Sequence, residues 1–427
     1  MLQQPRPWTR LIIADPGLID SIGHHLGYSL SVAEAARDAG LPPLILAGHG
    51  FRGHAGSVPI RPVFNAAYQS ATRPSRLRGT IYGVASLLPA PVGRGIAQSL
   101  RAARRLLRRS TATPDRLGVE LAGELAAMPD AAGALVLLHS VSAANLAGLP
   151  AAIAPEAIGG LSVVLRRTPV EMDTTDAAAD PIAVVMTRLR AHFGDRLRVF
   201  ADTEDLAAIY HALLGQDVIV APLPVVTPPI RTEPVGDPPH LVFAGGARAE
   251  KGYMALPALV RRLRGRARFT IHSGVVTDNS DPLVQAAHRA LKAMADPAVT
   301  LLERSLDPES YLALIGSADL LLLPYDGPAY GPRSSGILAE ARAMGVPAAV
   351  PARTWMETAV GPSHAIVFDG IDDFPRAVEA ALAELPSLSV QFRAAAGPWR
   401  ARHNPASLGR ILTDWQPTVV PPRPARV

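Results

Sequence analysis

Short apolar segments alternate with longer amphipathic ones along most of the chain. In the first half, apolar runs of strand length occur at 10–15, 43–48, 134–139, 161–167, 197–202 and 217–222. Runs that are apolar throughout suit strands buried on both faces, and helical periodicity between them is typical of βαβ units. The first half therefore predicts one parallel sheet with helices on both faces.

The same pattern restarts after a proline-rich stretch. Residues 221–240 read APLPVVTPPIRTEPVGDPPH. So many prolines cannot continue a helix, and they predict a stiff connector between two domains. Apolar runs of strand length then return at 240–246, 267–274, 298–303, 318–325, 346–351 and 364–369. The second half therefore predicts another doubly wound sheet.

A length of 427 residues agrees with two domains, because single cores stop growing at about 250–300 residues. We predict an α/β protein with two doubly wound, Rossmann-like domains. The predicted boundaries are 1–225 for the N-terminal domain, 226–239 for a proline-rich linker and 240–390 for the C-terminal domain. Residues 391–427 are predicted to form helices, which can cross back to the N-terminal domain, followed by a frayed tail.

The composition excludes several kinds of protein and site. Apolar residues make up 48% of the chain and charged residues 19%, which is typical of a globular rather than a disordered protein. The absence of cysteine excludes disulfides, thiolate metal sites and cysteine nucleophiles. The first residues lack the apolar stretch of a signal peptide, and no apolar run is long enough to span a bilayer. We therefore expect a cytoplasmic protein.

Positive charge is concentrated in one helical-looking stretch at 94–116. Its basic residues are Arg94, Arg101, Arg104, Arg105, Arg108, Arg109 and Arg116. A solvated basic face is the simple interpretation. Peripheral contact with anionic lipid headgroups at the inner face of the membrane, or with a phosphate-bearing acceptor, is the alternative. Nucleic acid is not expected as a partner, because no aromatic residues interleave with the arginines.

One of only two lysines lies in a glycine-rich turn after the apolar run at 240–246. The turn reads GGARAEKG and contains Gly246, Arg248 and Lys251. Such a turn lets backbone amides approach an anion, and we expect a helix to begin near Gly252. Two cations here suit a diphosphate, because arginine binds it as a fork and lysine as a point charge. Solvated charges on an exposed turn are the alternative.

A second candidate site follows the apolar run at 318–325. The loop carries Ser334, Ser335 and Gly336 and leads into a predicted helix. Serine and glycine at a helix start offer hydroxyls and amides to phosphate. Glu340 follows Gly336 by one helical turn, and a carboxylate there can accept hydrogen bonds from ribose hydroxyls. An ordinary surface glutamate of an amphipathic helix is the alternative.

The segments GGARAEKG and YGPRSSGILAEARAMGVPAAVP together resemble the donor half of retaining glycosyltransferases with the GT-B fold, in particular glycosyltransferase family 4. The resemblance is specific over 240–370 and extends by layout to almost the whole chain. It implies two Rossmann-like domains that face each other across a cleft. It also implies a UDP- or GDP-sugar donor on the C-terminal domain, a polysaccharide, glycan or lipid-linked acceptor on the N-terminal domain, and transfer with retention in a bacterial enzyme.

The same resemblance implies roles for individual residues. Arg248 and Lys251 hold the donor diphosphate, and Glu340 holds the nucleotide ribose. One loop supplies phosphate-binding groups and contains Ser334, Ser335, Gly336 and Ile337. A second loop borders the nucleobase and contains Glu303, Arg304 and Ser305. Pro332 stands where the family often has a first glutamate near the donor sugar, which leaves the sugar open.

Candidate residues in the first half follow two of its apolar runs. Gly23 lies in a glycine-rich loop with His24 and His25, and family members place such a loop near the donor phosphates and the acceptor. Adjacent histidines at a helix start diverge by about 100°, which disfavours a shared metal, so an acceptor or phosphate contact and a structural role stay open. His139 ends its run at a strand carboxyl end, where α/β sheets place ligands. By resemblance it is a catalytic candidate beside the anomeric carbon, and a structural role is the alternative.

The chain has no Asp-x-Asp motif to hold a divalent cation against a diphosphate. The charge of the leaving group would then fall to Arg248, Lys251 and backbone amides, and no metal or other cofactor is expected. Two other functions stay open. A sugar-nucleotide epimerase uses the same paired domains, and a catalytically degenerate relative could bind nucleotide as a scaffold in polysaccharide biosynthesis.

Overall fold

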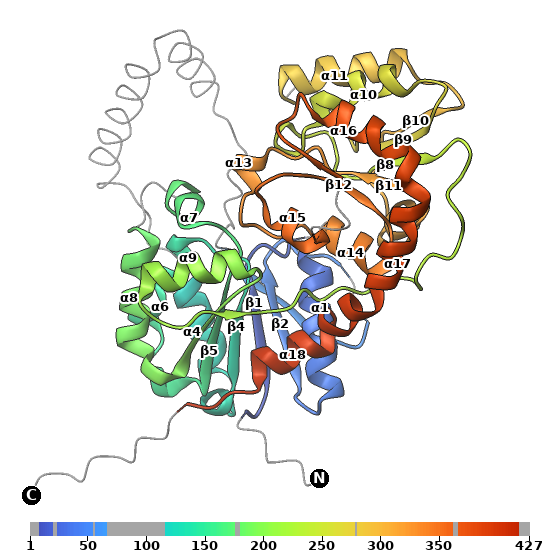
Figure 1. The fold of residues 1–427 in the computed structure, drawn as a ribbon. Helices are drawn as coiled ribbons and strands as arrows, with labels where there is room; N and C mark the ends of the chain where they lie inside the picture. The colour runs from blue at the N-terminus through green and yellow to red at the C-terminus, as the bar shows by residue number, and fades with distance from the viewer. Residues whose placement is uncertain are drawn as a thin grey trace, which may run out of the picture. The chain divides into compact units, whose positions relative to one another are not determined.

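The computed structural model describes residues 8–19, 24–53, 56–65, 116–175, 180–277, 280–361 and 366–417. The chain divides into two compact units, and Figure 1 draws the elements of both. Unit 1 comprises Met1–Ala201, Ala207–Ile219 and Leu412–Val427, and unit 2 comprises Asp202–Leu206 and Val220–Ile411. Each unit is built on one parallel sheet, as the alternation of apolar runs predicts.

The described part of unit 1 forms a seven-stranded sheet in the order β3-β2-β1-β4-β5-β6-β7. Its strands are β1 (Leu11–Asp15), β2 (Pro43–Gly48), β3 (Ile60–Phe64), β4 (Leu135–Leu138), β5 (Gly160–Leu165), β6 (Leu197–Ala201) and β7 (Ile219–Val220). In register, Leu11 lies opposite Pro43 on one side and Leu135 on the other. The strand order reverses between β1 and β4, which is where doubly wound sheets bind ligands.

The edge strand β3 is a correction to the six strands predicted for the first half. It reads IRPVF, and two of its five residues are exposed. An edge strand tolerates Pro62, because one side of the strand has no neighbour and needs no N–H donor. It also needs less apolar surface than a central strand. A search for buried runs therefore misses it.

The helices in the described part of unit 1 are α1 (His24–Asp38), α4 (Leu117–Ala126), α5 (Ala143–Ala147), α6 (Leu149–Ala152), α7 (Pro169–Thr175), α8 (Ile182–Phe193) and most of α9 (Glu204–Leu214). The residue Ser142 starts α5 with a reciprocal cap. Its Oγ accepts from the N–H of Asn145, and the Asn145 side chain accepts from the N–H of Ser142. This cap fixes the path of the chain directly after β4.

The described part of unit 2 forms a six-stranded sheet in the order β10-β9-β8-β11-β12-β13. Its strands are β8 (His240–Phe243), β9 (Arg268–His272), β10 (Val299–Leu302), β11 (Leu320–Leu322), β12 (Ala348–Pro351) and β13 (Ile366–Phe368). Here the strand order reverses between β8 and β11. The two segments that carry the predicted donor-binding residues follow these two strands.

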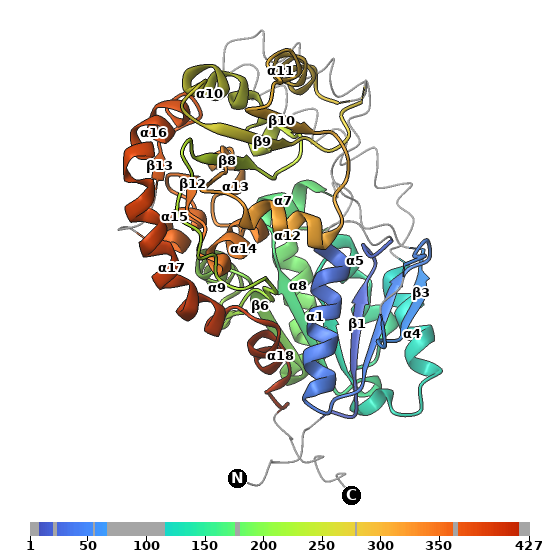
Figure 2. The ribbon, with the colours of Figure 1, turned by 90° about the vertical axis from the view of Figure 1, so that its right-hand side faces the viewer.

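Helices cover both faces of this sheet. They are α10 (Leu256–Leu263), α11 (Pro282–Ala293), α12 (Pro308–Gly316), α13 (Gly327–Tyr330), α14 (Gly336–Met344), α15 (Trp355–Val360), α16 (Phe374–Ala381), α17 (Leu385–Arg402) and α18 (Pro405–Thr413), whose end belongs to unit 1. Figure 2 shows α10 and α11 on one side of the sheet and α12 and α14 on the other. Successive strand residues serve the two cores, since Phe243 joins the first and Val242 the second.

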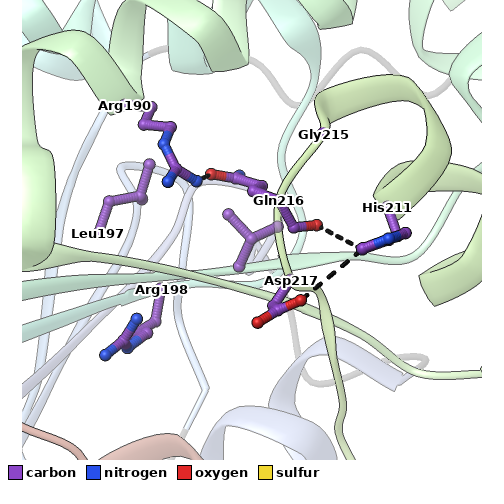
Figure 3. A pocket seen from close by; sticks show the side chains of 8 residues that line it. Arg190, Leu197, Arg198, His211, Gly215, Gln216 and Asp217 are labelled. Carbon is purple, nitrogen blue, oxygen red and sulfur yellow. Dashed lines mark hydrogen bonds and ion pairs between the residues drawn. The ribbon is translucent and has the colours of Figure 1, made fainter.

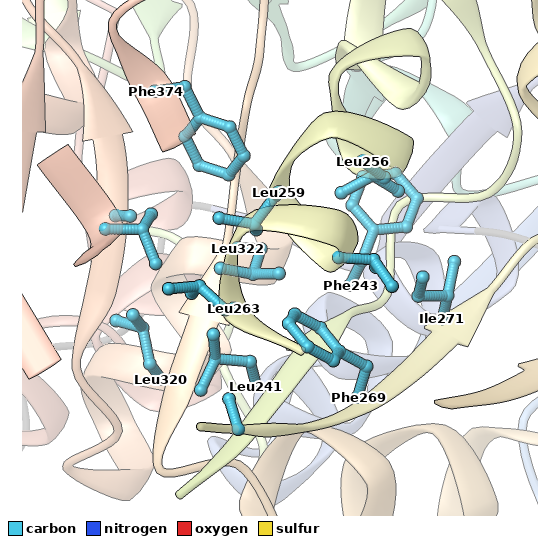
Figure 4. Close-up of a cluster of buried hydrophobic side chains, with 14 of the residues drawn as sticks. Leu241, Phe243, Leu256, Leu259, Leu263, Phe269, Ile271, Leu320, Leu322 and Phe374 are labelled. Carbon is cyan, nitrogen blue, oxygen red and sulfur yellow. The ribbon is translucent and has the colours of Figure 1, made fainter. Parts of the chain in front are cut away.

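The core under α10 shows how a helix of unit 2 is held (Figure 4). The apolar residues of α10 recur at helical spacing and are fully buried; they are Leu256, Leu259, Val260 and Leu263. Arg261 and Arg262 occupy the exposed face. Burying each such leucine contributes roughly 2 kcal/mol, so this face fixes the helix and the turn before it against the sheet.

The proline-rich segment predicted as a linker, 226–239, is part of unit 2. Its Arg231 forms an ion pair with Asp319 at 2.8 Å. The Asp319 carboxylate also accepts from the N–H of Gly236 at 3.2 Å and from the N–H of His240 at 2.7 Å. Asp319 is buried, so these contacts satisfy a charge that would otherwise be unpaired. The segment is therefore tied to the sheet that follows it.

Candidate functional site

The glycine-rich turn after β8 is anchored to the neighbouring strand β9. The N–H of Gly246 donates to the carbonyl of His272 at 3.1 Å, and the N–H of Ala247 donates to the carbonyl of Ser273 at 2.8 Å. Gly246 has a φ of 71°, which glycine adopts without strain. The turn is therefore held at the carboxyl end of the sheet, and the Gly246 N–H already has a partner within the protein.

Gly252 closes this turn and fits only as glycine. Its φ is 67°, and a Cβ there would lie 1.6 Å from the carbonyl oxygen of Pro324. Helical backbone begins at Tyr253, near Gly252 as predicted, but its first turn is 3₁₀ rather than α-helical. Two short 3₁₀ turns, Ala249–Lys251 and Tyr253–Ala255, come first, and α10 begins at Leu256. The left-handed conformation of Gly252 interrupts a right-handed helical path.

Arg248 and Lys251 lie on this turn in different environments. The Arg248 side chain is 55% exposed, and its Nε is 3.3 Å from Oε1 of Glu250. Lys251 is half-buried, with Nζ 5.5 Å from the ring centre of Tyr325. Burial, with a further contribution from the charge of Arg248, lowers the pKa of Lys251 to about 7. A bound anion would raise that pKa again, because it stabilises the protonated amine.

The serine loop leads into α14, and Ser335 caps this helix. Ser335 is buried, and its Oγ accepts from the N–H of Leu338 at 3.4 Å. Ser334 donates to Oδ2 of Asp202 at 2.6 Å. Gly336 is exposed, and a Cβ added to it would meet no atom within 4 Å. The serines therefore hold the loop in place, and the open space lies at the first residue of the helix.

Glu340 lies on α14 within electrostatic reach of Lys251. Burial raises the pKa of the Glu340 carboxyl to about 7, and Lys251 opposes that shift. Its Oε2 is buried and has no hydrogen-bond partner among the described residues. Tyr325 joins the two segments, because its ring lies beside Lys251 and its hydroxyl bonds Ser335. A buried acceptor without a donor is unfavourable, so Oε2 suits a hydroxyl supplied by a ligand.

Three further residues that were predicted to contact the nucleotide have side chains in different environments. Ile337 packs into the apolar core, so only its backbone could meet a phosphate. Oε1 of Glu303 accepts from Nζ of Lys292 at 3.2 Å, and this bond is the largest cause of the lowered pKa of Glu303. The Arg304 side chain is exposed, and its carbonyl lies 3.0 Å from Nε2 of His272. Arg304 therefore lies beside the end of β9, next to the anchored turn.

Unit 1 holds a second polar cluster where the strand order reverses between β1 and β4. The Asp15 carboxylate is fully buried and accepts from the N–H of Gly17 at 3.1 Å. It also accepts from Nδ1 of His25 at 3.0 Å and from Oγ of Ser29 at 3.2 Å. Burial alone would raise the pKa of Asp15, but His139 and His25 lower it well below its ordinary value. Asp15 therefore carries a negative charge inside the unit.

His139, the predicted catalytic histidine, belongs to the same cluster. Its side chain has no exposed surface, and its Nε2 lies 3.3 Å from Oδ2 of Asp15. Nε2 is 2.9 Å from Oγ of Ser29, Nδ1 is 2.9 Å from Oγ of Ser140, and the ring stacks on Tyr28. Burial lowers the pKa of His139, although Asp15 opposes that shift. The ring is therefore neutral at pH 7, and both of its nitrogens have partners inside the protein.

Sequence reasoning did not single out Asp15. The signal was present, because a charged residue that ends an otherwise apolar buried strand is unusual. The predicted Gly23 and the basic stretch 94–115 lie outside the described residues. Arg116, which ends that stretch, is described, and its Nε is 3.7 Å from Oε1 of Glu120. A surface pair of this kind has little effect on stability.

Within the described residues, no three side chains of His, Cys, Asp or Glu are arranged to hold a metal ion. No helix among these residues is long and apolar enough to cross a bilayer.

A polar pocket of unit 1 lies beside the start of β6, and Figure 3 shows the side chains that line it. It is lined by Arg190, Leu197, Arg198, Val199, His211, Gly215, Gln216 and Asp217. Arg190 donates to the Gln216 side chain, and Nδ1 of His211 lies 2.9 Å from the Gln216 carbonyl oxygen. Leu197 is the first residue of β6, whereas the predicted site residues follow strand carboxyl ends. The pocket is therefore separate from the candidate site.

Comparisons with known proteins bear on the fold. No family model and no curated protein matches the sequence. Sucrose-phosphate synthase from Thermosynechococcus elongatus is similar in structure, with a TM-score of 0.62 and 13% identity over 95% of this chain and 98% of that chain. HepE from Anabaena, solved with UDP, has a TM-score of 0.61 and 12% identity over 95% and 98%. WaaG, a glycosyltransferase of lipopolysaccharide biosynthesis, has a TM-score of 0.58 and 13% identity over 95% and 100%. The chain thus has the two-domain α/β architecture of GT-B glycosyltransferases, which confirms the predicted fold class.

Proposed function

We propose that this protein is a glycosyltransferase that moves a sugar from a nucleotide-diphosphate sugar to a polysaccharide, glycan or lipid-linked acceptor. The observation that carries the proposal is the convergence of Lys251, Glu340 and Ser335 around Tyr325 in unit 2. These groups supply a cation, a buried carboxylate oxygen without a donor and a capped helix start. A nucleoside diphosphate offers the matching groups, namely an anion and two ribose hydroxyls.

The donor is a UDP- or GDP-sugar in this proposal. Arg248 and Lys251 contact the diphosphate, and Glu340 accepts from the ribose. Backbone N–H groups at Gly336 and Ile337 complete the phosphate site, and the base lies toward Arg304. Among the structural neighbours, HepE was solved with UDP and glucose, and a trehalose-phosphate synthase is described as UDP-forming, which supports a nucleotide-sugar donor of this kind.

Transfer is proposed to proceed with retention and without metal, as in glycosyltransferase family 4. Negative charge grows on the leaving diphosphate as its bond to the sugar breaks. Arg248 and Lys251 stabilise that charge more strongly in the transition state than in the ground state, and this difference accelerates the reaction. The acceptor binds to unit 1, and the enzyme works in the cytoplasm, with the 94–116 stretch contacting anionic lipid.

Replacing Lys251 or Glu340 with alanine tests this proposal. Each variant should lose at least about 3 kcal/mol of transition-state stabilisation, which is a fall in kcat/KM of about 150-fold. Thermal shifts with UDP-, GDP- and ADP-sugars identify the donor first, because a preferred ligand raises the midpoint of unfolding. Release of nucleoside diphosphate from that donor then measures turnover.

The matched control is Arg262→Ala, which removes a cation from the exposed face of α10 and a surface pair with Glu379. It should leave turnover unchanged. Near-normal turnover in both Lys251→Ala and Glu340→Ala would refute the proposed site. Product analysis separates the other functions, because an epimerase yields an altered sugar and a scaffold consumes no donor.

Donor affinity should be highest near pH 7 and fall on either side. The pKa of Lys251 is lowered to about 7, so above pH 7 the free protein loses a proton that the diphosphate requires. The pKa of Glu340 is raised to about 7, so below pH 7 its carboxyl is protonated and accepts less well. Calorimetric titration of the nucleotide sugar from pH 6 to 9 checks this. Lys251→Arg should keep its affinity above pH 7, since arginine stays charged.

A further inference from the structure

The start of α12 places the side chain of Tyr311 at the carboxyl end of the sheet in unit 2. Asp307 caps this helix, because its Oδ1 accepts from the N–H of Ser310 at 2.9 Å. Its carbonyl also accepts from the N–H of Tyr311 at 2.9 Å. The Tyr311 ring meets the ring of His272, the last residue of β9, edge to face with 6.3 Å between the ring centres. A capped backbone and a ring contact therefore fix the direction of this side chain.

Tyr311 packs into the same core as residues of the candidate site. Its ring is partly buried against the cluster that contains Tyr325 and Ile337, the second residue of α14. Burial raises the pKa of Tyr311 well above its ordinary value, and the charge of Glu340 raises it further. The Tyr311 hydroxyl therefore keeps its proton at pH 7, and it lies within electrostatic reach of the Glu340 carboxylate on α14.

The carboxylate and the hydroxyl need partners of opposite kinds. Oε2 of Glu340 is a buried acceptor that has no donor among the described residues. The Tyr311 hydroxyl is a donor, and within the described part of the chain it has no hydrogen-bond partner either. An ionised carboxylate only accepts, whereas a hydroxyl both donates and accepts. One ligand hydroxyl between the two groups would give Glu340 its donor and Tyr311 its acceptor.

We propose that Tyr311 and Glu340 together bind one ribose hydroxyl of the donor nucleotide. This inference deepens the proposed function and rests on it. The ribose O–H donates to Oε2 of Glu340, and the ribose oxygen accepts from the hydroxyl of Tyr311. A deoxyribose that lacks this group leaves both protein groups unsatisfied, and a site built in this way rejects it. Tyr311 is thus a specificity-determining residue, which selects ribonucleotide over deoxyribonucleotide donors.

A water molecule could also lie between the two groups, because it too donates and accepts. In that case Tyr311 would serve the fold alone, and the protein would not distinguish ribose from deoxyribose. The neighbouring charge favours the ribose. Lys251 opposes the raised pKa of Glu340, so the proposed diphosphate-binding cation lies near the same carboxylate. The diphosphate and the ribose of one nucleotide would therefore meet adjacent groups.

The test compares the wild-type protein with Tyr311→Phe, which removes the hydroxyl and keeps the ring. Calorimetry measures the affinity of each protein for UDP and GDP and for their 2′-deoxy and 3′-deoxy forms. Tyr210→Phe is the matched control, because its hydroxyl already donates to the Arg167 carbonyl at 2.7 Å inside unit 1. Urea unfolding of all three proteins measures the effect of each substitution on the fold.

The wild type should bind its preferred ribonucleotide at least about 10-fold more tightly than one of the two deoxy forms. Tyr311→Phe should lose about 10-fold in affinity for the ribonucleotide and little for that deoxy form, so its preference for ribose falls. Tyr210→Phe should keep the preference. The urea midpoint of Tyr311→Phe should stay at the wild-type value, because the lost hydroxyl has no partner in the protein, whereas that of Tyr210→Phe should fall.

Two results would overturn the role of Tyr311 and leave the diphosphate site intact. One is an equal loss of affinity for the ribonucleotide and its deoxy forms in Tyr311→Phe, or no loss at all, because the hydroxyl would then bind water or support the fold. The other is a wild type that binds nucleotide without any preference for ribose. No binding of any nucleotide would refute the proposed function, and this inference with it.

Discussion

Replacing Gly252 with alanine should destabilise unit 2 by about 4 kcal/mol or more and abolish the proposed nucleotide binding. Two effects add at this residue. A φ of 67° is unfavourable for any residue with a Cβ, by about 1–2 kcal/mol. The new Cβ would also lie 1.6 Å from the Pro324 carbonyl oxygen, which is backbone and cannot rotate away. Either the turn that carries Lys251 or the strand end at Pro324 must move.

The matched control is Gly265→Ala. Gly265 also lies in unit 2 and has a φ of 77°, but a Cβ there would meet no atom within 4 Å. This variant should lose only about 1 kcal/mol, which is the backbone term alone. Urea unfolding of both variants measures the difference in free energy of unfolding. If both variants lost the same free energy of unfolding, the contact with Pro324 would have no effect on stability and the prediction would be wrong.

Replacing Asp15 with alanine should lower the free energy of unfolding by about 3 kcal/mol or more. The substitution removes the acceptor of the Gly17 N–H, the Ser29 hydroxyl and the His25 ring at once. The Ser29 hydroxyl is fully buried, so it cannot turn to water instead. Asp15→Asn should lose less free energy of unfolding, because one side-chain oxygen remains to accept a hydrogen bond. Chemical unfolding at pH 7 measures the series.

The acid dependence of stability gives a second readout of Asp15. Its folded-state pKa lies well below the ordinary value, so its stabilisation is present above about pH 4 and is lost as the pH falls further. Asp15→Ala should therefore unfold with a shallower dependence on pH below 4 than the wild type. Asp38→Ala is the control, because that carboxylate is 77% exposed and its removal should change stability by less than about 0.5 kcal/mol. If Asp38→Ala lost as much stability as Asp15→Ala, the effect of Asp15 would not depend on its buried hydrogen bonds.

The central strands could be read from the sequence because they are buried on both faces. Strands such as β4 and β5 are apolar at nearly every residue, so their runs stand out without any knowledge of neighbours. β3 could not be read in this way, because an edge strand buries little and Pro62 argues against it. The close approach of Gly252 to the Pro324 carbonyl could not be read either, because Pro324 is far away in the chain.

The candidate site was partly visible before folding. Lys251, Ser335 and Glu340 lie in motifs, and the structure brings them together around Tyr325. The contact between Asp15 and His25 was harder to predict from the sequence, because it depends on Gly17 and on where α1 begins. The enclosure of His139 could not be predicted, because burial depends on what packs over a strand end. Residue types identify chemistry, whereas contacts decide which group faces a ligand.

Periodicity and turn chemistry are local properties of the chain, so they were enough to predict the two parallel sheets and the two glycine- and serine-rich turns. The folded structure alone shows that the buried Asp15 carboxylate, at the end of β1, contacts a partly exposed and a fully enclosed histidine. It also shows that Lys251 and Glu340 share a half-buried environment. Those arrangements depend on burial and on charges from distant segments. Desolvation and Coulomb forces act through space, so they are fixed only when the strands have taken their order in the sheet.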